Sequence, residues 1–139
     1  MPRSGPIILV EDDIDDQELI TEIIGGSPVR NPLKIFHNGL QALEYLKNST
    51  EYPFLIICDV NMPVMNGLEL RQHMQDDLSM HNRSAPFIFL STTEDREVVK
   101  KAFALSVQGF FKKPSEFREL QRLLELALNY WKHCEYPKK

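Results

Sequence analysis

Short apolar runs recur five times along the chain, and an amphipathic stretch follows each of them. The runs have the composition and the length of strands; they are Pro6–Val10, Leu33–Phe36, Phe54–Cys58, Phe87–Leu90 and Gly109–Phe111. The stretches carry apolar residues at helical spacing; they are Asp15–Ile24, Gly39–Lys47, Gly67–Leu78, Glu94–Leu105 and Ser115–Lys132. Strands and helices that alternate in this way form a parallel sheet with right-handed crossovers. The pattern predicts an α/β fold, with a doubly wound five-stranded parallel sheet and five helices.

Length and local signals refine this prediction. A chain of 139 residues suits one domain, so we expect a single domain over residues 1–139, with its core at 6–132 and a short tail at 133–139. Ser115, just after Pro114, is placed to cap the last helix. The polar segment 76–84 predicts a loop.

Composition excludes several classes of protein. The formal net charge is −4, which gives no support to nonspecific nucleic-acid binding, because that binding needs a basic face. No apolar run approaches the roughly 20 residues of a membrane span, and acids follow the first run too soon for a secretory signal. Cys58 and Cys134 lie far apart and fit no metal or disulfide spacing, as expected in a reducing cytosol. We therefore expect a cytoplasmic protein with neither a nucleic-acid nor a membrane partner.

Chemically capable residues follow four of the five runs. Ligands of such sheets bind at the carboxyl ends of the strands, so these residues are expected to converge. In chain order they are Glu11-Asp12-Asp13, Asp59, Ser91-Thr92-Thr93 and Lys112-Lys113-Pro114.

This set of residues predicts phosphoryl chemistry with a metal ion. Carboxylates held close together repel one another unless a cation lies among them, and few carboxylates with room for water favour Mg²⁺. Beside the metal, Ser91 could donate to a phosphoryl oxygen and Lys113 could neutralise another. A carboxylate can also attack phosphorus itself, and Asp59, alone and central, is the natural nucleophile.

Simpler explanations hold for the neighbouring residues. Asp13, Asp15 and Asp16 are expected only to favour the dipole at a helix N-terminus. Thr92 or Thr93 is explained by a helix cap, and Lys112 by solvation.

The segments VEDD, ICDVNMPVMNG, FLST and FFKKP resemble the receiver domain of two-component response regulators. The similarity runs from Pro6 to the end of the last helix, and the long connection before the fourth run is similar to stand-alone receivers paired with phytochrome-type kinases. The resemblance implies a flavodoxin-like fold with strand order 2-1-3-4-5. It also implies a histidine kinase or phosphotransfer protein as phosphodonor, Mg²⁺ as cofactor, and an output through protein–protein interactions rather than through enzymatic turnover.

The resemblance assigns a role to each residue of the site. Asp59 corresponds to the phosphoacceptor, Asp12 to the direct metal ligand, and Glu11 to an acid acting mostly through water. The implied metal ligands are completed by Asp59 itself and by the backbone carbonyl of Asn61. The other assigned residues are Lys113, which pairs with the phosphoryl group, and the switch residues Ser91 and Phe110.

The sequence departs from the family pattern at Thr92 and Phe110, and three other functions are weighed against the family one. Thr92 is bulkier than the small residue usual after the switch hydroxyl, so a non-switching adaptor stays open. A phosphatase of the haloacid-dehalogenase type also forms an aspartyl phosphate, but it needs a second acid where this chain has Asn61. A flavodoxin-like electron carrier would need a phosphate-binding loop after the first run, where the acids of VEDD would repel phosphate.

The second departure from the family pattern is at the aromatic switch position. Phe110 stands there in place of tyrosine, so it can signal by burial but not through a hydroxyl.

The last amphipathic stretch carries more apolar residues than one covered face needs. Leu123, Leu126 and Tyr130 lie beside its main stripe. They either pack against neighbouring helices or form a homodimer interface, and the downstream partner is otherwise unknown.

Overall fold

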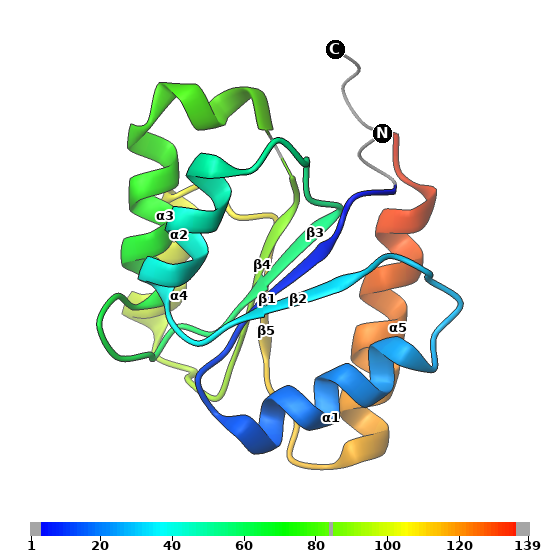
Figure 1. Cartoon of the computed structure of the whole chain (residues 1–139). Coiled ribbons are helices and arrows are strands. Elements are labelled where there is room, and N and C mark those ends of the chain that lie inside the picture. Colours follow the sequence, from blue (N-terminus) through cyan, green and yellow to red (C-terminus); the bar gives the residue numbers. More distant parts are fainter. Residues whose placement is uncertain (1–3, 84, 136–139) are drawn as a thin grey trace.

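The computed structural model describes residues 4–83 and 85–135. Five parallel strands form one sheet in the order β2-β1-β3-β4-β5, which confirms the predicted fold class and topology (Figure 1). The strands are β1 (Ile7–Val10), β2 (Leu33–Phe36), β3 (Leu55–Cys58), β4 (Phe87–Ser91) and β5 (Gly109–Lys112). The helices are α1 (Ile14–Gly25), α2 (Gly39–Asn48), α3 (Gly67–Asp76), the 3₁₀ helix η2 (Leu78–Arg83), α4 (Arg96–Ala104) and α5 (Phe117–His133).

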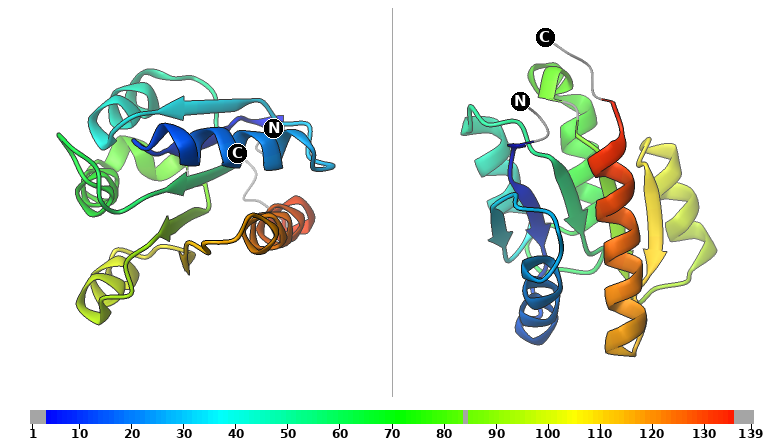
Figure 2. Two further views of the ribbon diagram at one scale, coloured as in Figure 1. Left: turned by 90° about the horizontal axis from the view of Figure 1, so that it is seen from below. Right: turned by 90° about the vertical axis from the view of Figure 1, so that its right-hand side faces the viewer.

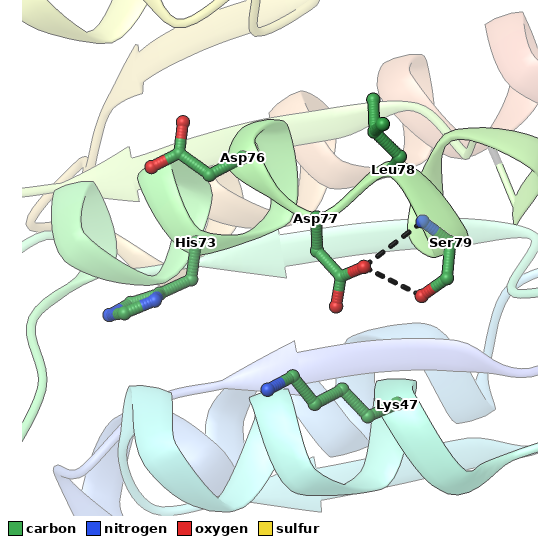
Figure 3. A pocket seen from close by; sticks show the side chains of 6 residues that line it. All are labelled: Lys47, His73, Asp76, Asp77, Leu78 and Ser79. Atoms are coloured by element: carbon green, nitrogen blue, oxygen red, sulfur yellow. Dashed lines mark hydrogen bonds between the residues drawn. The ribbon is translucent and has the colours of Figure 1, made fainter.

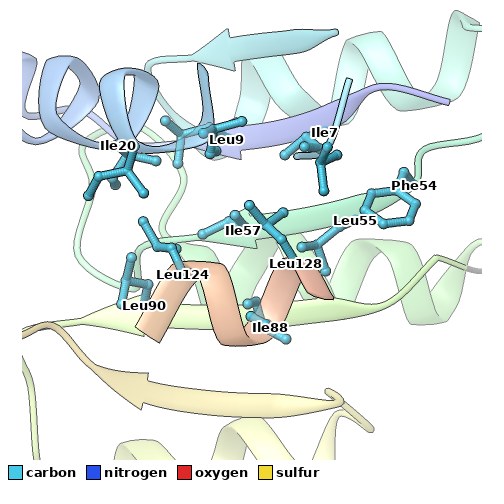
Figure 4. Packing of buried hydrophobic residues seen from close by; sticks show 14 of the residues in the cluster. Ile7, Leu9, Ile20, Phe54, Leu55, Ile57, Ile88, Leu90, Leu124 and Leu128 are labelled. Atoms are coloured by element: carbon cyan, nitrogen blue, oxygen red, sulfur yellow. The ribbon is translucent and has the colours of Figure 1, made fainter. Parts of the chain in front are cut away.

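Helices cover both faces of the sheet. Helices α1 and α5 lie on one face, and α2, α3 and α4 lie on the other (Figures 1 and 2). Strands β1, β3 and β4 are therefore buried along their whole length, as their unbroken apolar sequences indicate. Figure 4 shows the cluster on the first face, where Ile7 and Leu9 of β1 pack with Leu124 and Leu128 of α5.

Three local predictions were wrong. Helix α4 is capped by Asp95, whose side chain accepts from the Glu97 N–H, and not by Thr92 or Thr93. Helix α5 begins at Phe117 after Glu116, which makes no side-chain capping hydrogen bond. Ser115 therefore lies too early in the chain to be the cap. In the segment expected to be a loop, the Asp77 carboxylate accepts hydrogen bonds from the N–H and the hydroxyl of Ser79, and these bonds tighten the chain into η2.

Strand register brings the ends of the central strands to a common level. Val10 pairs with Cys58, and Cys58 pairs with Phe89. Farther along, Ser91 pairs with Lys112. The residues that follow β1, β3, β4 and β5 therefore lie along one edge of the sheet. In the described part of the chain, no helix combines the length and the hydropathy of a membrane span.

Candidate functional site

Asp59 stands directly after β3 and is fixed by hydrogen bonds of the loop. Its backbone N–H donates to the Val10 carbonyl at 2.9 Å, and its Oδ1 accepts from the Val60 N–H at 2.7 Å. The side chain keeps 12% of its surface exposed, although the strand before it is buried. A carboxylate that is both accessible and rigidly placed is suited to act as a nucleophile or as a metal ligand.

Gly67 allows the loop after Asp59 to return to the strand end. Its N–H donates to the Val60 carbonyl at 2.8 Å. A Cβ at this position would overlap the Asp59 carbonyl oxygen and would lie 2.7 Å from the Phe89 ring. Only glycine fits this close approach, which accounts for the residue at position 67.

Three carboxylates converge at this edge of the sheet, as predicted. Oxygens of Glu11, Asp12 and Asp59 all lie within 4.8 Å of one another; Glu11 is buried and Asp12 is exposed. Three oxygen donors at this spacing, with an open side for water, fit a hard divalent cation. Asn61 follows two residues after Asp59 in the same loop and is exposed.

Glu11 is unusual because it is almost wholly removed from water. Its side chain is 2% exposed, and burial raises its pKa to about 7. The hydrogen bond from Lys113 opposes this rise in pKa, and the nearby charge of Asp59 adds to it. Gln17, also buried, donates through Nε2 to the Glu11 carbonyl at 2.6 Å and so fixes the backbone at this position.

Lys113 reaches into the acidic cluster from the end of β5. Its Nζ lies 2.9 Å from Glu11 Oε1, 2.8 Å from Asp16 Oδ2 and 4.0 Å from Asp59 Oδ2. Burial alone would lower the pKa of the ammonium, but its hydrogen bonds to Asp16 and Glu11 outweigh this and hold the pKa above its ordinary value. The side chain is 7% exposed and stays charged beside Asp59.

The two predicted switch residues lie on the neighbouring strands β4 and β5. Ser91 is fully buried, and its Oγ accepts a long hydrogen bond of 3.4 Å from the Thr93 N–H. Phe110 is half-buried, with its ring centroid 5.7 Å from that of Phe89. The Thr92 side chain is exposed at the strand end.

The sequence reasoning missed two contributors. Asp16 was expected only to favour a helix dipole, but its carboxylate contacts the Lys113 ammonium. Gln17 was not considered, although it holds the backbone of Glu11. Their position in the chain could have indicated both residues, because the first turn of a helix that follows β1 lies at the same sheet edge as the end of β5. Lys112 forms an exposed ion pair with Glu94 at 3.0 Å, consistent with its predicted solvation.

A hollow lies at the carboxyl ends of α2 and α3, away from the acidic cluster. Figure 3 shows Lys47 of α2 across from Asp77, whose carboxylate accepts both hydrogen bonds from Ser79. His73 and Asp76 also line it. The hollow is open to solvent, and the bonds between Asp77 and Ser79 belong to the turn into η2.

A family model for the response regulator receiver domain matches residues 7–125. The chain belongs to the response regulator receiver family. Among curated proteins, the receiver is 26% identical over 130 residues to response regulator Rcp1 of Synechocystis, covering 90% of this chain and 87% of that protein. It is 32% identical over 138 residues to the Regulator of RpoS of Escherichia coli, covering 98% of this chain but only 36% of that protein.

Solved structures have the same fold. The receiver matches the crystal structure of the phosphorylated cyanobacterial phytochrome response regulator RcpA with a TM-score of 0.83 and 26% identity, over 93% of this chain and 94% of that one. The Mn²⁺-bound form of Rcp1 matches with a TM-score of 0.84 and 24% identity, over 97% and 99% of the two chains. The fold and the family predicted from the sequence are confirmed.

Proposed function

We propose that this receiver accepts a phosphoryl group on Asp59 from a histidine kinase or a phosphotransfer protein. The observation that carries the proposal is the position of the Asp59 carboxylate, which lies within metal-ligand spacing of two acids and 4.0 Å from a buried ammonium. An Asp59 oxygen attacks the phosphorus of a donor phosphohistidine, and the O–P bond forms as the P–N bond breaks. The imidazole leaves and takes a proton from water. Lys113 stabilises the negative charge on the transferring group.

We assign the metal site to Glu11, Asp12, Asp59 and the Asn61 carbonyl, with Mg²⁺ as the preferred ion. The all-oxygen donor set supports this choice. When bound, the metal neutralises charge on the phosphoryl oxygens during transfer. The chain's own contribution is to hold Asp12 and Asp59 just beyond the ends of two adjacent strands, β1 and β3.

Phosphorylation by acetyl phosphate tests this proposal. With Mg²⁺ present, the intact mass should rise by one phosphoryl group, and chelation of the metal should prevent this. Asp12→Ala should slow the reaction about a hundredfold, because it removes the exposed ligand of the metal. Asp15→Ala, which removes an exposed acid in the first turn of α1, is the matched control and should react like wild type. An Asp12→Ala rate equal to that of wild type would remove Asp12 from the metal site.

The proposed output is a change in protein–protein contacts. Ser91 would exchange its hydrogen bond from Thr93 for one donated to a phosphoryl oxygen, and Phe110 would move inward beside Phe89. Such a switch requires contacts that differ between the two states. The weak 3.4 Å bond to Ser91 and the half-buried Phe110 ring support the switch, because neither is tightly held.

We further propose that the changed surface is a homodimer interface on α5. Leu123 packs against the core and needs no partner, but Leu126 and Tyr130 are 67% and 60% exposed. They line an apolar groove of about 570 Å³ with Phe111 of β5. A twofold interface would bring this groove against its own copy.

Light scattering of the phosphorylated and unphosphorylated protein tests the switch and the interface together. Phosphorylated wild type should show the mass of a dimer, whereas phosphorylated Ser91→Ala should stay monomeric. Leu126→Asp should be monomeric in both states, because a charge would be buried in the interface. If wild type shows one mass in both states, the output is not self-association, and equal binding of a heterologous partner in both states would favour the adaptor alternative.

The donor and the setting are proposed from similarity and composition. The likeness to Rcp1 and RcpA supports a phytochrome-type histidine kinase as donor. The buried Cys58 thiol, which lies outside any disulfide, supports a reducing cytoplasm. The proposal makes the protein a signalling switch rather than an enzyme, and Asn61, where a phosphatase of this chemistry needs an acid, supports that choice.

A further inference from the structure

Three carboxylates surround the Lys113 ammonium, which follows the end of β5. The Lys113 ammonium is within hydrogen-bonding distance of Glu11 and Asp16, at 2.9 and 2.8 Å, but not of Asp59, at 4.0 Å. The two short contacts lie on the side of β1 and α1. The ammonium is thus held toward α1 and away from the proposed phosphoacceptor.

The fold places Asp16 firmly in this position. It lies in the first turn of α1, and its backbone N–H donates to the capping Asp13 side chain at 3.1 Å. The Asp16 side chain is 27% exposed, whereas its neighbour Asp15 belongs to the exposed face of the helix. The capped first turn of α1 therefore holds Asp16 in place for its contact with Lys113, which lies 97 positions later in the sequence.

We propose that Asp16 is a positioning residue that holds the Lys113 ammonium back from Asp59 and so competes with the phosphoryl group for it. The inference rests on the proposed function of Asp59. A charge-assisted hydrogen bond must be weakened or broken before the ammonium can move fully onto a phosphoryl oxygen. The Asp16 contact therefore favours the unphosphorylated state and sets how readily the receiver is phosphorylated.

The proposal predicts a gain of reactivity, which a merely structural role for Asp16 would not produce. Asp16→Asn removes one of the two charges that hold the Lys113 ammonium away from Asp59, so only Glu11 still competes with the phosphoryl group. At limiting acetyl phosphate and constant Mg²⁺, we expect phosphorylation to be about fivefold faster than in wild type. Asp16→Glu, which keeps the charge, should return the rate toward that of wild type.

Asp15→Asn is the matched control. It removes the same charge from the same turn of α1, and so reports the effect of net charge and helix dipole alone. The second control is a Lys113→Ala background, in which Asp16→Asn should give no gain beyond that of Asp15→Asn. Thermal unfolding of each variant identifies any that is damaged in its fold, and Asp16→Ala then serves as the second substitution at this position.

The phosphorylation rates of these variants decide between a positioning role and a merely structural role for Asp16. A rate for Asp16→Asn that is higher than for Asp15→Asn, and only when Lys113 is present, supports the proposal. A rate equal to that of Asp15→Asn, or lower than wild type, overturns it and leaves Asp16 as a structural partner of Lys113. If wild type itself accepts no phosphoryl group while Asp16→Asn also accepts none, it is the function proposed for Asp59 that fails.

Discussion

Asp59→Asn is expected to abolish phosphoryl acceptance and to leave the fold intact. An amide is not a nucleophile toward phosphorus, so the rate should fall by more than about a thousandfold. The substitution keeps the size of the side chain, and the amide oxygen can still accept the 2.7 Å hydrogen bond from the Val60 N–H. Thermal unfolding should therefore stay close to that of wild type.

The measurement is intact mass after incubation with acetyl phosphate and Mg²⁺. Asp76→Asn, at the far end of α3, is the charge-matched control and should gain one phosphoryl group as wild type does. Incorporation by Asp59→Asn at the wild-type level would show that another side chain is the acceptor.

Gly67→Ala is expected to destabilise the protein by about 2–4 kcal/mol. The added methyl group would overlap the Asp59 carbonyl oxygen and would lie 2.7 Å from the Phe89 ring, so the loop that carries the site would have to shift. Backbone and a packed ring cannot move aside as the end of a flexible side chain could. Phosphorylation should fall as well, because the shift moves Asp59 away from its position.

Gly25→Ala is the matched control for that substitution. A Cβ at Gly25 meets nothing within 4 Å, at the last residue of α1. Its effect on the free energy of unfolding should be within about 1 kcal/mol of zero, with stabilisation favoured because alanine loses less entropy in a helix. Equal urea midpoints for the two variants would contradict the close approach at Gly67.

The parts of the fold that follow from local pattern were predictable. The unbroken apolar runs gave β1, β3 and β4, and parallel strands joined by helices bring Glu11, Asp12, Asp59 and Lys113 to one edge. Element ends were less predictable, because they depend on single hydrogen bonds. Asp77 binding Ser79 turned an expected loop into η2, and α5 starts after Ser115 rather than at it.

The contacts between the site residues were harder to predict than the identity of those residues. Sequence placed Lys113 beside an acidic cluster but could not say which acids it touches, because the choice depends on the rotation of α1 relative to β5. That rotation sets Asp16 against the ammonium and leaves Asp15 on the exposed face. The near-complete burial of Glu11 likewise depends on packing that no local pattern reveals.

The acceptor residue can be identified directly by chemical trapping. Borohydride reduces an acyl phosphate to an alcohol and releases phosphate, so a phosphorylated aspartate becomes homoserine. After acetyl phosphate and Mg²⁺ treatment of wild type, peptide mass spectrometry should find homoserine at position 59 in the peptide that carries Asn61 and Met62. Homoserine at position 12 or 16, or none at position 59 in protein that has gained a phosphoryl group, would contradict the central claim.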